Sequence, residues 1–101
     1  MTNVCFEWDL RKELENIRKH GFSFDEAIEV FADDTVIHLE DVKHSSEEER
    51  YYAVGRTKQG VILTVRYTLR EKVIRIFGAA RWRKWEEYYE AHSQSKEDEK
   101  N

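Results

Sequence analysis

The sequence contains no proline, four glycines and a single cysteine in 101 residues. A lone cysteine excludes an internal disulfide, and with no CxxC partner it forms no zinc-binding pattern, which fits a reducing compartment. No apolar run approaches the roughly 20 residues that a membrane-spanning helix needs. The start, MTNVCFEWDLRKE, lacks the apolar core of a secretory signal. We therefore expect one cytoplasmic domain with no membrane association.

Several signatures of catalytic and cofactor sites are also missing. The four histidines lie at positions 20, 38, 44 and 92, without the HxxxH or Cys/His spacing of a metal site. There is no glycine-rich phosphate loop and no G-x-S-x-G nucleophile motif. We expect neither a metal nor another cofactor, and we expect Cys5 to be a buried strand residue.

Charge is distributed unevenly along the chain. Residues 1–49 hold five Lys/Arg and fourteen Asp/Glu, a net −9, whereas residues 50–84 hold ten Lys/Arg and one acid, a net +9. Residues 85–101 add two lysines and six acids, so the overall charge of −4 conceals a strongly basic middle segment. This asymmetry predicts a site for a polyanion or for an acidic partner.

Periodicity predicts two short helices near the start. VCFEW (4–8) alternates between apolar and other residues and is expected to be an edge strand. Asp9 can then cap a helix over 10–20. The apolar stripe of this helix is Leu10, Leu14 and Ile17, the pattern of a helix that packs on a core. Gly21 suits its left-handed C-terminal position. Ser23 and Glu26 form an S-x-x-E capping box for a second helix over 24–31.

The remaining pattern is that of strands followed by one helix. Residues 35–40, 50–57, 61–69 and 72–80 are rich in β-branched and aromatic residues, and short links between the last three predict antiparallel neighbours. A helix over 81–92 follows, with Trp85 and Tyr89 expected in the core, and 93–101 is expected to be a disordered acidic tail. The fold class is α+β: two N-terminal helices, an antiparallel sheet of about four strands, and a C-terminal helix, in one domain over 1–92.

Cationic side chains gather on this predicted sheet. In the strand over 61–69, Val61, Leu63, Val65 and Tyr67 share one face, which leaves a largely polar face as a ligand surface. RIFGAARWRK (75–84) joins the last strand to the last helix and borders that surface. Guanidinium and ammonium groups can hold phosphates, and Trp82 can stack on an unpaired base or pack in the core. The candidate RNA-binding residues are Lys19, Arg56, Arg66, Arg70, Arg81, Trp82, Arg83 and Lys84.

Cleavage of RNA needs little beyond such a surface. The 2′-hydroxyl is an internal nucleophile, so a protein must remove its proton, stabilise charge on the phosphorane and protonate the leaving oxygen. Arginines can stabilise the phosphorane, and a histidine or a carboxylate can remove the proton. His20 is the best-placed histidine by sequence, although a histidine at a helix end is equally well explained by the helix dipole.

Two segments resemble the BrnT family of toxins. FEWDLRKELENIRKHGFSFDEAIEVFAD (6–33) is similar to that family's F-E-W-D, N-x-K/R-K-H-G, S-F-x-E-A and F-x-D, and HSSEEERYYAVGRT (44–57) resembles its H-S-x-x-E-E-R-x-x-x-x-G. The resemblance covers roughly residues 6–90. It implies a RelE-like fold and a metal-independent endoribonuclease that cleaves single-stranded mRNA and inhibits translation. It also implies a BrnA-like ribbon-helix-helix antitoxin as partner, in a 2:2 complex.

Carried over by position, the matching residues are Lys19 and, as catalytic candidates, His20, Glu49, Arg50 and Arg75. The chain departs from the family where the last strand commonly reads I-S-A-R, because here it reads FGAA (77–80), with Gly78 for the serine and Ala80 for the arginine. Two alternatives to a ribonuclease therefore stay open: a decayed toxin that only binds its antitoxin, and a nucleic-acid-binding module that does not cleave.

Overall fold

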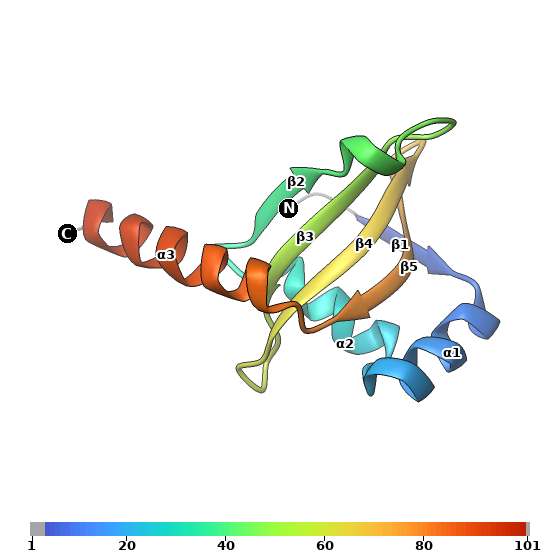
Figure 1. Cartoon of the computed structure of the whole chain (residues 1–101), viewed down its shortest axis with the longest axis horizontal. Helices are drawn as coiled ribbons and strands as arrows, with labels where there is room; N and C mark the ends of the chain where they lie inside the picture. Colours follow the sequence, from blue (N-terminus) through green and yellow to red (C-terminus); the bar gives the residue numbers. More distant parts are fainter. Residues whose placement is uncertain (1–3, 101) are drawn as a thin grey trace.

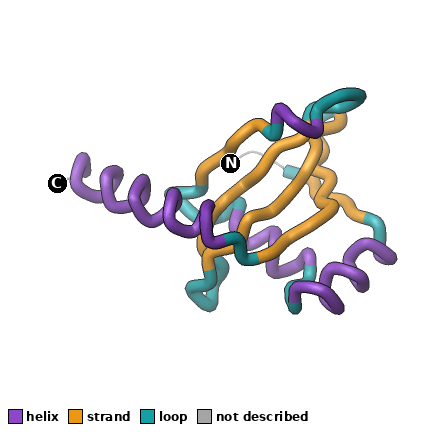
Figure 2. Tube along the Cα trace, viewed as in Figure 1, coloured by secondary structure: helices purple, strands orange, loops and turns teal. Residues whose placement is uncertain are grey.

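The computed structural model describes residues 4–100, with side chains up to residue 93. The strands form one five-stranded sheet in the order β1-β5-β4-β3-β2 (Figures 1 and 2). In chain order the elements are β1 (Cys5–Trp8), α1 (Leu10–His20), α2 (Phe24–Val30), β2 (Ile37–Glu40), the 3₁₀ helix η1 (Val42–His44), β3 (Arg50–Arg56), β4 (Ile62–Arg70), β5 (Val73–Ala80) and α3 (Arg83–Lys100).

The α+β fold class and the antiparallel run from β2 to β5 are confirmed. The sheet has one strand more than the approximate prediction, because β1 joins it as a parallel edge strand beside β5. β4 and β5 are joined by the two-residue turn Glu71-Lys72, whose φ angles are 48° and 73°. Sequence gave the location of this turn but not its left-handed backbone.

Local sequence signals set both helix starts. The Asp9 carboxylate accepts a hydrogen bond from the Arg11 backbone N–H at 2.8 Å, and Gly21 ends α1 at φ 80°. Ser23 and Glu26 form the predicted reciprocal capping box at the start of α2. These caps satisfy backbone groups that a helix end otherwise leaves unpaired.

Helix α1 lies with its polar side toward the protein, so the expectation of a core-facing apolar stripe was wrong. Leu10, Leu14 and Ile17 are 65%, 59% and 41% exposed, whereas Glu13 and Asn16 are buried. The reason is hydrogen bonding. The Glu13 carboxylate accepts from Trp8 Nε1 and from the Phe24 backbone N–H, and Asn16 bonds to the β5 backbone (see below).

The two faces of the sheet are covered differently. Helix α2 packs on one face over a core that includes Phe24, Val65 and Ile76, and α3 covers part of the other face, where Tyr89 meets Val54. Figure 1 shows α3 in front of the sheet and α2 behind it. The rest of the α3 face is left open.

Two further expectations differ from the structure. Cys5 is exposed, so its predicted burial was wrong: it lies on the edge strand and alternates with Phe6 and Trp8, which pack on the core. Helix α3 continues to Lys100, beyond the end predicted near residue 92 (Figure 1). The core positions of Tyr89, which is 1% exposed, and of the half-buried Trp85 are as predicted.

Candidate functional site

The open part of the sheet carries a cluster of four guanidinium groups. Strand alternation brings alternate side chains of β3, β4 and β5 to this face, because paired residues in neighbouring strands point the same way. Arg50 pairs in register with Thr68, and Thr68 pairs with Arg75 on the other side. We call Arg50, Arg66, Arg70 and Arg75 the arginine cluster.

The ring of Phe77 lies beside two members of this cluster. The guanidinium carbon of Arg50 is 5.1 Å from the Phe77 ring centroid, and that of Arg66 is 5.3 Å from it. Phe77 is the extra residue of a β-bulge, since Tyr67 pairs with Ile76 while Arg66 pairs with Gly78. The bulge turns the phenyl ring toward the cluster and lets it hold two cations by its π face.

Two carboxylates neutralise part of the cluster. Arg70 Nε donates to Glu48 at 2.7 Å, and Arg75 Nη1 donates to Glu7 at 2.7 Å. The hydrogen bond from Arg70 lowers the pKa of Glu48, and the charges of Arg70, Arg50 and Arg75 lower it further. Among the described residues, Arg50 and Arg66 have no ion-pair partner, so their charges are available to an anion.

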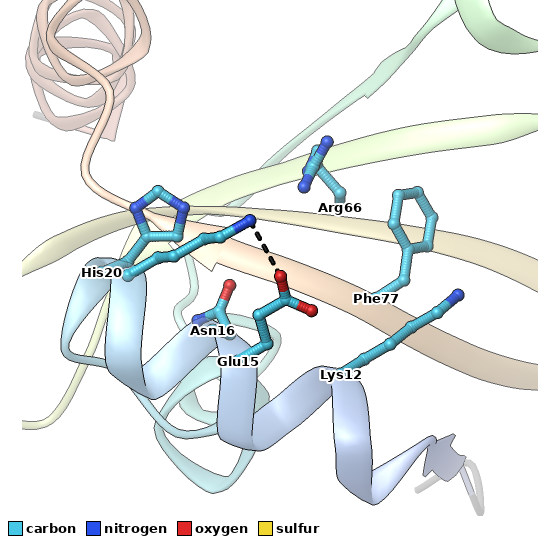
Figure 3. A pocket seen from close by; sticks show the side chains of 7 residues that line it. Lys12, Glu15, Asn16, His20, Arg66 and Phe77 are labelled. Atoms are coloured by element: carbon cyan, nitrogen blue, oxygen red, sulfur yellow. Dashed lines mark ion pairs between the residues drawn. The ribbon is translucent and has the colours of Figure 1, made fainter.

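A hollow of about 270 Å³ separates the cluster from helix α1. Figure 3 shows α1 along one side of it and Arg66 and Phe77 on the opposite side. Glu15 in this hollow accepts from Lys19 at 2.9 Å, which lowers the pKa of the carboxyl. We call this space the α1 hollow; its lining residues are Lys12, Glu15, Asn16, Lys19, His20, Arg66 and Phe77.

Asn16 fixes α1 to the sheet. Its side-chain amide donates to the Ala79 carbonyl at 2.8 Å and accepts from the Ala79 N–H at 3.1 Å. It also donates to the Phe22 carbonyl at 2.9 Å. Because β1 pairs with β5 only as far as Ile76, the amide takes the place of a further strand residue. This contact positions His20, one turn later on α1, beside the sheet.

A second hollow of about 330 Å³ adjoins the first and shares Asn16, His20 and Arg66 with it. We call it the Trp82 hollow. Its other lining residues are Thr64, Ala79, Ala80, Arg81 and Trp82. Ala80 stands where the BrnT pattern has arginine, and its small side chain lies in register with Thr64. Arg66 and Arg81 therefore supply the guanidinium groups around this space.

The lack of a side chain at Gly78 leaves space that the Arg66 guanidinium occupies. A Cβ atom at residue 78 would lie 2.6 Å from Arg66 Nη2 and 2.8 Å from Nε. The departure from the family serine thus leaves room for the Arg66 guanidinium to lie across β5.

Most of the predicted site residues come together. His20 and Lys19 lie at the α1 hollow, and the structure places Arg50, Arg66, Arg70 and Arg75 in one cluster. Arg81 and Trp82 line the adjoining hollow, where Arg81 also pairs with Glu86 at 2.9 Å.

Four predicted residues lie elsewhere. The Glu49 carboxylate accepts a hydrogen bond from Tyr51, which packs on the α2 side of the sheet, so Glu49 is separated from Arg50. Arg56 lies over the Tyr89 ring, 5.5 Å from its centroid, and donates to the Gly60 carbonyl. Arg83 and Lys84 are exposed in the first turn of α3, with Lys84 Nζ 4.8 Å from the Trp85 ring centroid.

Sequence reasoning missed several residues of the site, namely Glu7, Lys12, Glu15, Asn16, Glu48 and Phe77. Asn16 opens the segment NIRKHG (16–21) of the family resemblance, which was a signal that it has a role. Glu48 stands in the same EEE run as Glu49, and only the loop geometry decides which carboxylate meets the arginines. The position of Phe77 depends on the bulge, for which the sequence has no clear marker.

These features define a small α+β protein with a cluster of guanidinium groups on an open sheet face. Its family follows from comparison. The family model described as "Ribonuclease toxin, BrnT, of type II toxin-antitoxin system" matches residues 8–86. The chain belongs to this family of ribonuclease toxins, and such a system includes an antitoxin partner.

A solved structure supports the fold. The chain is similar to the Brucella abortus ribonuclease toxin BrnT, with a TM-score of 0.61 and 20% identity over 77% of this chain and 95% of that chain. No curated protein matches the sequence. Within residues 4–100, no helix is long and apolar enough to cross a membrane, and no three potential metal ligands are grouped closely enough to hold an ion.

Proposed function

We propose that this chain is a cytoplasmic, metal-independent endoribonuclease that cleaves single-stranded RNA and thereby inhibits translation. The observation that carries the proposal is the convergence of the arginine cluster on one open sheet face, next to His20. Arg50 and Arg66 share the Phe77 ring, so both can contact one phosphodiester and its neighbour. The family assignment of residues 8–86 points to the same chemistry.

The reaction forms a bond from the ribose 2′-oxygen to phosphorus and breaks the bond to the 5′-oxygen, which leaves with a proton taken from solvent. His20 accepts the proton of the 2′-hydroxyl, because an imidazole changes protonation readily near neutral pH. Arg50 and Arg66 stabilise the charge that develops on the phosphorane, since arginine forms bidentate hydrogen bonds to phosphate oxygens. Arg75 and Arg70 are held in place by Glu7 and Glu48 and bind flanking phosphates.

The test is cleavage of a long single-stranded RNA by the purified protein in the presence of EDTA. We expect cleavage to persist with the chelator and to fall by about 10²-fold or more in Arg50→Ala and His20→Ala, the size of a lost oxyanion or acid–base contribution. Lys58→Ala is the matched control, because it removes one charge from the exposed β3–β4 loop. RNA left intact by concentrated, freshly purified protein would refute the proposal.

A second candidate function is a toxin-like module that binds its antitoxin without cleaving RNA. Ala80, in place of the family arginine, is the observation that favours it. Induction of the gene alone distinguishes the two. Growth arrest that the neighbouring gene relieves supports the ribonuclease, and absence of arrest together with tight partner binding supports the module.

We propose a BrnA-like ribbon-helix-helix antitoxin as partner, in a 2:2 complex, with the exposed stripe of α1 as part of its binding surface. Leu10, Leu14 and Ile17 form an apolar stripe that the described part of this chain leaves exposed, flanked by the exposed Arg11 and Arg18. A partner segment with apolar and acidic side chains complements it. Self-association through the stripe is disfavoured, since antiparallel pairing of two α1 helices would bring their arginines together.

Co-purification with the product of the neighbouring reading frame tests this surface. We expect Leu14→Glu to weaken the complex at least tenfold, because a carboxylate replaces a buried apolar contact, while RNA cleavage is retained. The mass of the wild-type complex in solution reports the 2:2 state. A Leu14→Glu complex as stable as the wild type would show that the antitoxin binds elsewhere.

A further inference from the structure

We propose that the Trp82 hollow binds one nucleobase of the RNA; this rests on the proposed function and assigns a specific subsite to it. The first observation is a buried hydroxyl with no partner. Thr64 lines the hollow and is 3% exposed, and among the described residues its Oγ1 has no hydrogen-bond partner. A buried polar group without a partner is costly. Of the two threonine hydroxyls in this state, those of Thr64 and Thr68, only that of Thr64 belongs to a residue that lines a hollow, where a ligand atom can complete it.

The second observation is an indole that is exposed and yet held in place. Trp82 is 43% exposed. Its ring packs edge-to-face against Tyr52 at 5.7 Å and against Trp85 at 6.1 Å between centroids. These two contacts orient the indole before a ligand arrives, which reduces the entropy cost of stacking. Stacking on a fixed aromatic ring is the usual way in which single-stranded bases are bound.

The size and charge of the hollow suit a base that is attached to a phosphate. Its volume of about 330 Å³ lies at the small end of ligand sites, which range from about 300 to 1,000 Å³. The small side chain of Ala80 keeps the space above Thr64 open. Arg66 and Arg81 line the same space and can hold the phosphate on either side of the base. A free phosphate would use the arginines but would not stack on the indole.

Two residues that the proposed reaction uses, His20 and Arg66, connect this subsite to the cleavage site. Both residues line the Trp82 hollow and the α1 hollow. A base seated against Trp82 therefore places the adjoining ribose and phosphate next to His20. The subsite would thus hold the base of the nucleotide beside the scissile bond, with the Thr64 hydroxyl bonded to the edge of that base.

NMR of ¹⁵N-labelled protein tests the assignment directly. The three tryptophans give separate indole N–H signals, and Trp82→Phe identifies the one from Trp82. Adenosine and uridine 5′-monophosphates are titrated against ribose 5-phosphate, which carries the phosphate without a base. We expect the better nucleotide to shift the Trp82 signal and to bind about 5- to 150-fold more tightly than ribose 5-phosphate, the range of one stacked base.

Three variants distinguish an effect on nucleotide binding in the hollow from an effect on folding. Ala80→Leu fills the space and should abolish nucleotide binding, and Thr64→Val should weaken it about 2- to 12-fold, the effect of one net hydrogen bond. Thr68→Val is the matched control: its hydroxyl is also buried and unpartnered on the same strand, but it lines neither hollow. Both Thr→Val variants should be at least as stable as the wild type, and only Thr64→Val should lose affinity.

These experiments distinguish failure of the base subsite from failure of the proposed ribonuclease function. Equal affinity for ribose 5-phosphate and for both nucleotides overturns the base subsite, as does a folded Ala80→Leu protein that binds nucleotides as the wild type does. Nucleotide binding in the hollow without RNA cleavage supports the subsite and refutes the ribonuclease. RNA cleavage without a shift of the Trp82 indole signal supports the ribonuclease and refutes the base subsite.

Discussion

Substitution of Gly78 by alanine should impair RNA cleavage while the fold stays intact. The added Cβ atom would lie 2.6 Å from Arg66 Nη2, and an ordinary van der Waals contact begins at 3.4 Å. The guanidinium must therefore move by about 0.8 Å, away from its place 5.3 Å from the Phe77 centroid. The end of an arginine side chain can make this movement without disturbing the backbone of β5.

The expected magnitudes differ for stability and activity. Alanine is favoured over glycine by about 0.5–1 kcal/mol in a strand, which offsets the displacement, so the free energy of unfolding should stay within about 1 kcal/mol of the wild type. A catalytic group misplaced by about 1 Å can cost up to about 100-fold in rate. Urea unfolding and kcat/KM for RNA cleavage measure the two effects.

A double-mutant cycle with Arg66→Ala isolates the mechanism. Once the guanidinium is gone, the added methyl group has nothing to displace, so Gly78→Ala should change activity little in that background. A loss of more than about 2 kcal/mol of stability, or an equal loss of activity with and without Arg66, would refute the account of Gly78 as space for Arg66.

Three more predictions concern stability. Asn16→Ala should lower the unfolding free energy by about 2–4 kcal/mol in urea titration, because it leaves the buried Ala79 N–H and carbonyl unpaired; an effect below about 1 kcal/mol would contradict the role of Asn16 as a strand substitute. Replacement of Glu71-Lys72 by Asn-Gly should raise the melting temperature by several degrees, since both residues have positive φ and that turn favours Asn-Gly; an unchanged or lower value would argue against strain there. Burial raises the pKa of Tyr67 to about 12, above its unfolded value of about 10, so its stabilising contribution is complete below pH 10 and is lost as pH rises toward 12. Chemical unfolding across this range should show a shallower decline for Tyr67→Phe than for the wild type, and identical slopes would contradict it.

Sequence was most informative where one residue decides a local structure. Asp9, Gly21 and the Ser23–Glu26 pair specify helix ends through bonds to their own backbone, and these were predicted correctly. Alternation along β4 likewise separated the core residues from Thr64 and Arg66. Such signals depend on neighbours in the chain and need no knowledge of the tertiary fold.

The errors arose where distant segments decide the outcome. The apolar pattern of α1 predicted the wrong buried face. Glu13 accepts a hydrogen bond from the Phe24 N–H, and Asn16 bonds to a strand residue 63 positions later, and these bonds outweigh the burial of three aliphatic side chains. Whether Glu48 or Glu49 meets the arginines depends on the loop before β3. Sequence therefore predicted the charge and the sheet face of the site but not the hollows, which need α1 to be placed against β5.

The pairing of the first strand with the last has a consequence for synthesis on the ribosome. Asn16 and Glu7 meet partners that lie 63 and 68 positions later in the chain. At translation speeds of about 5–20 residues per second, the N-terminal half waits about 3–14 seconds for those partners. Neither hollow exists during that interval, so a nascent or truncated polypeptide that ends before β5 lacks the proposed catalytic site.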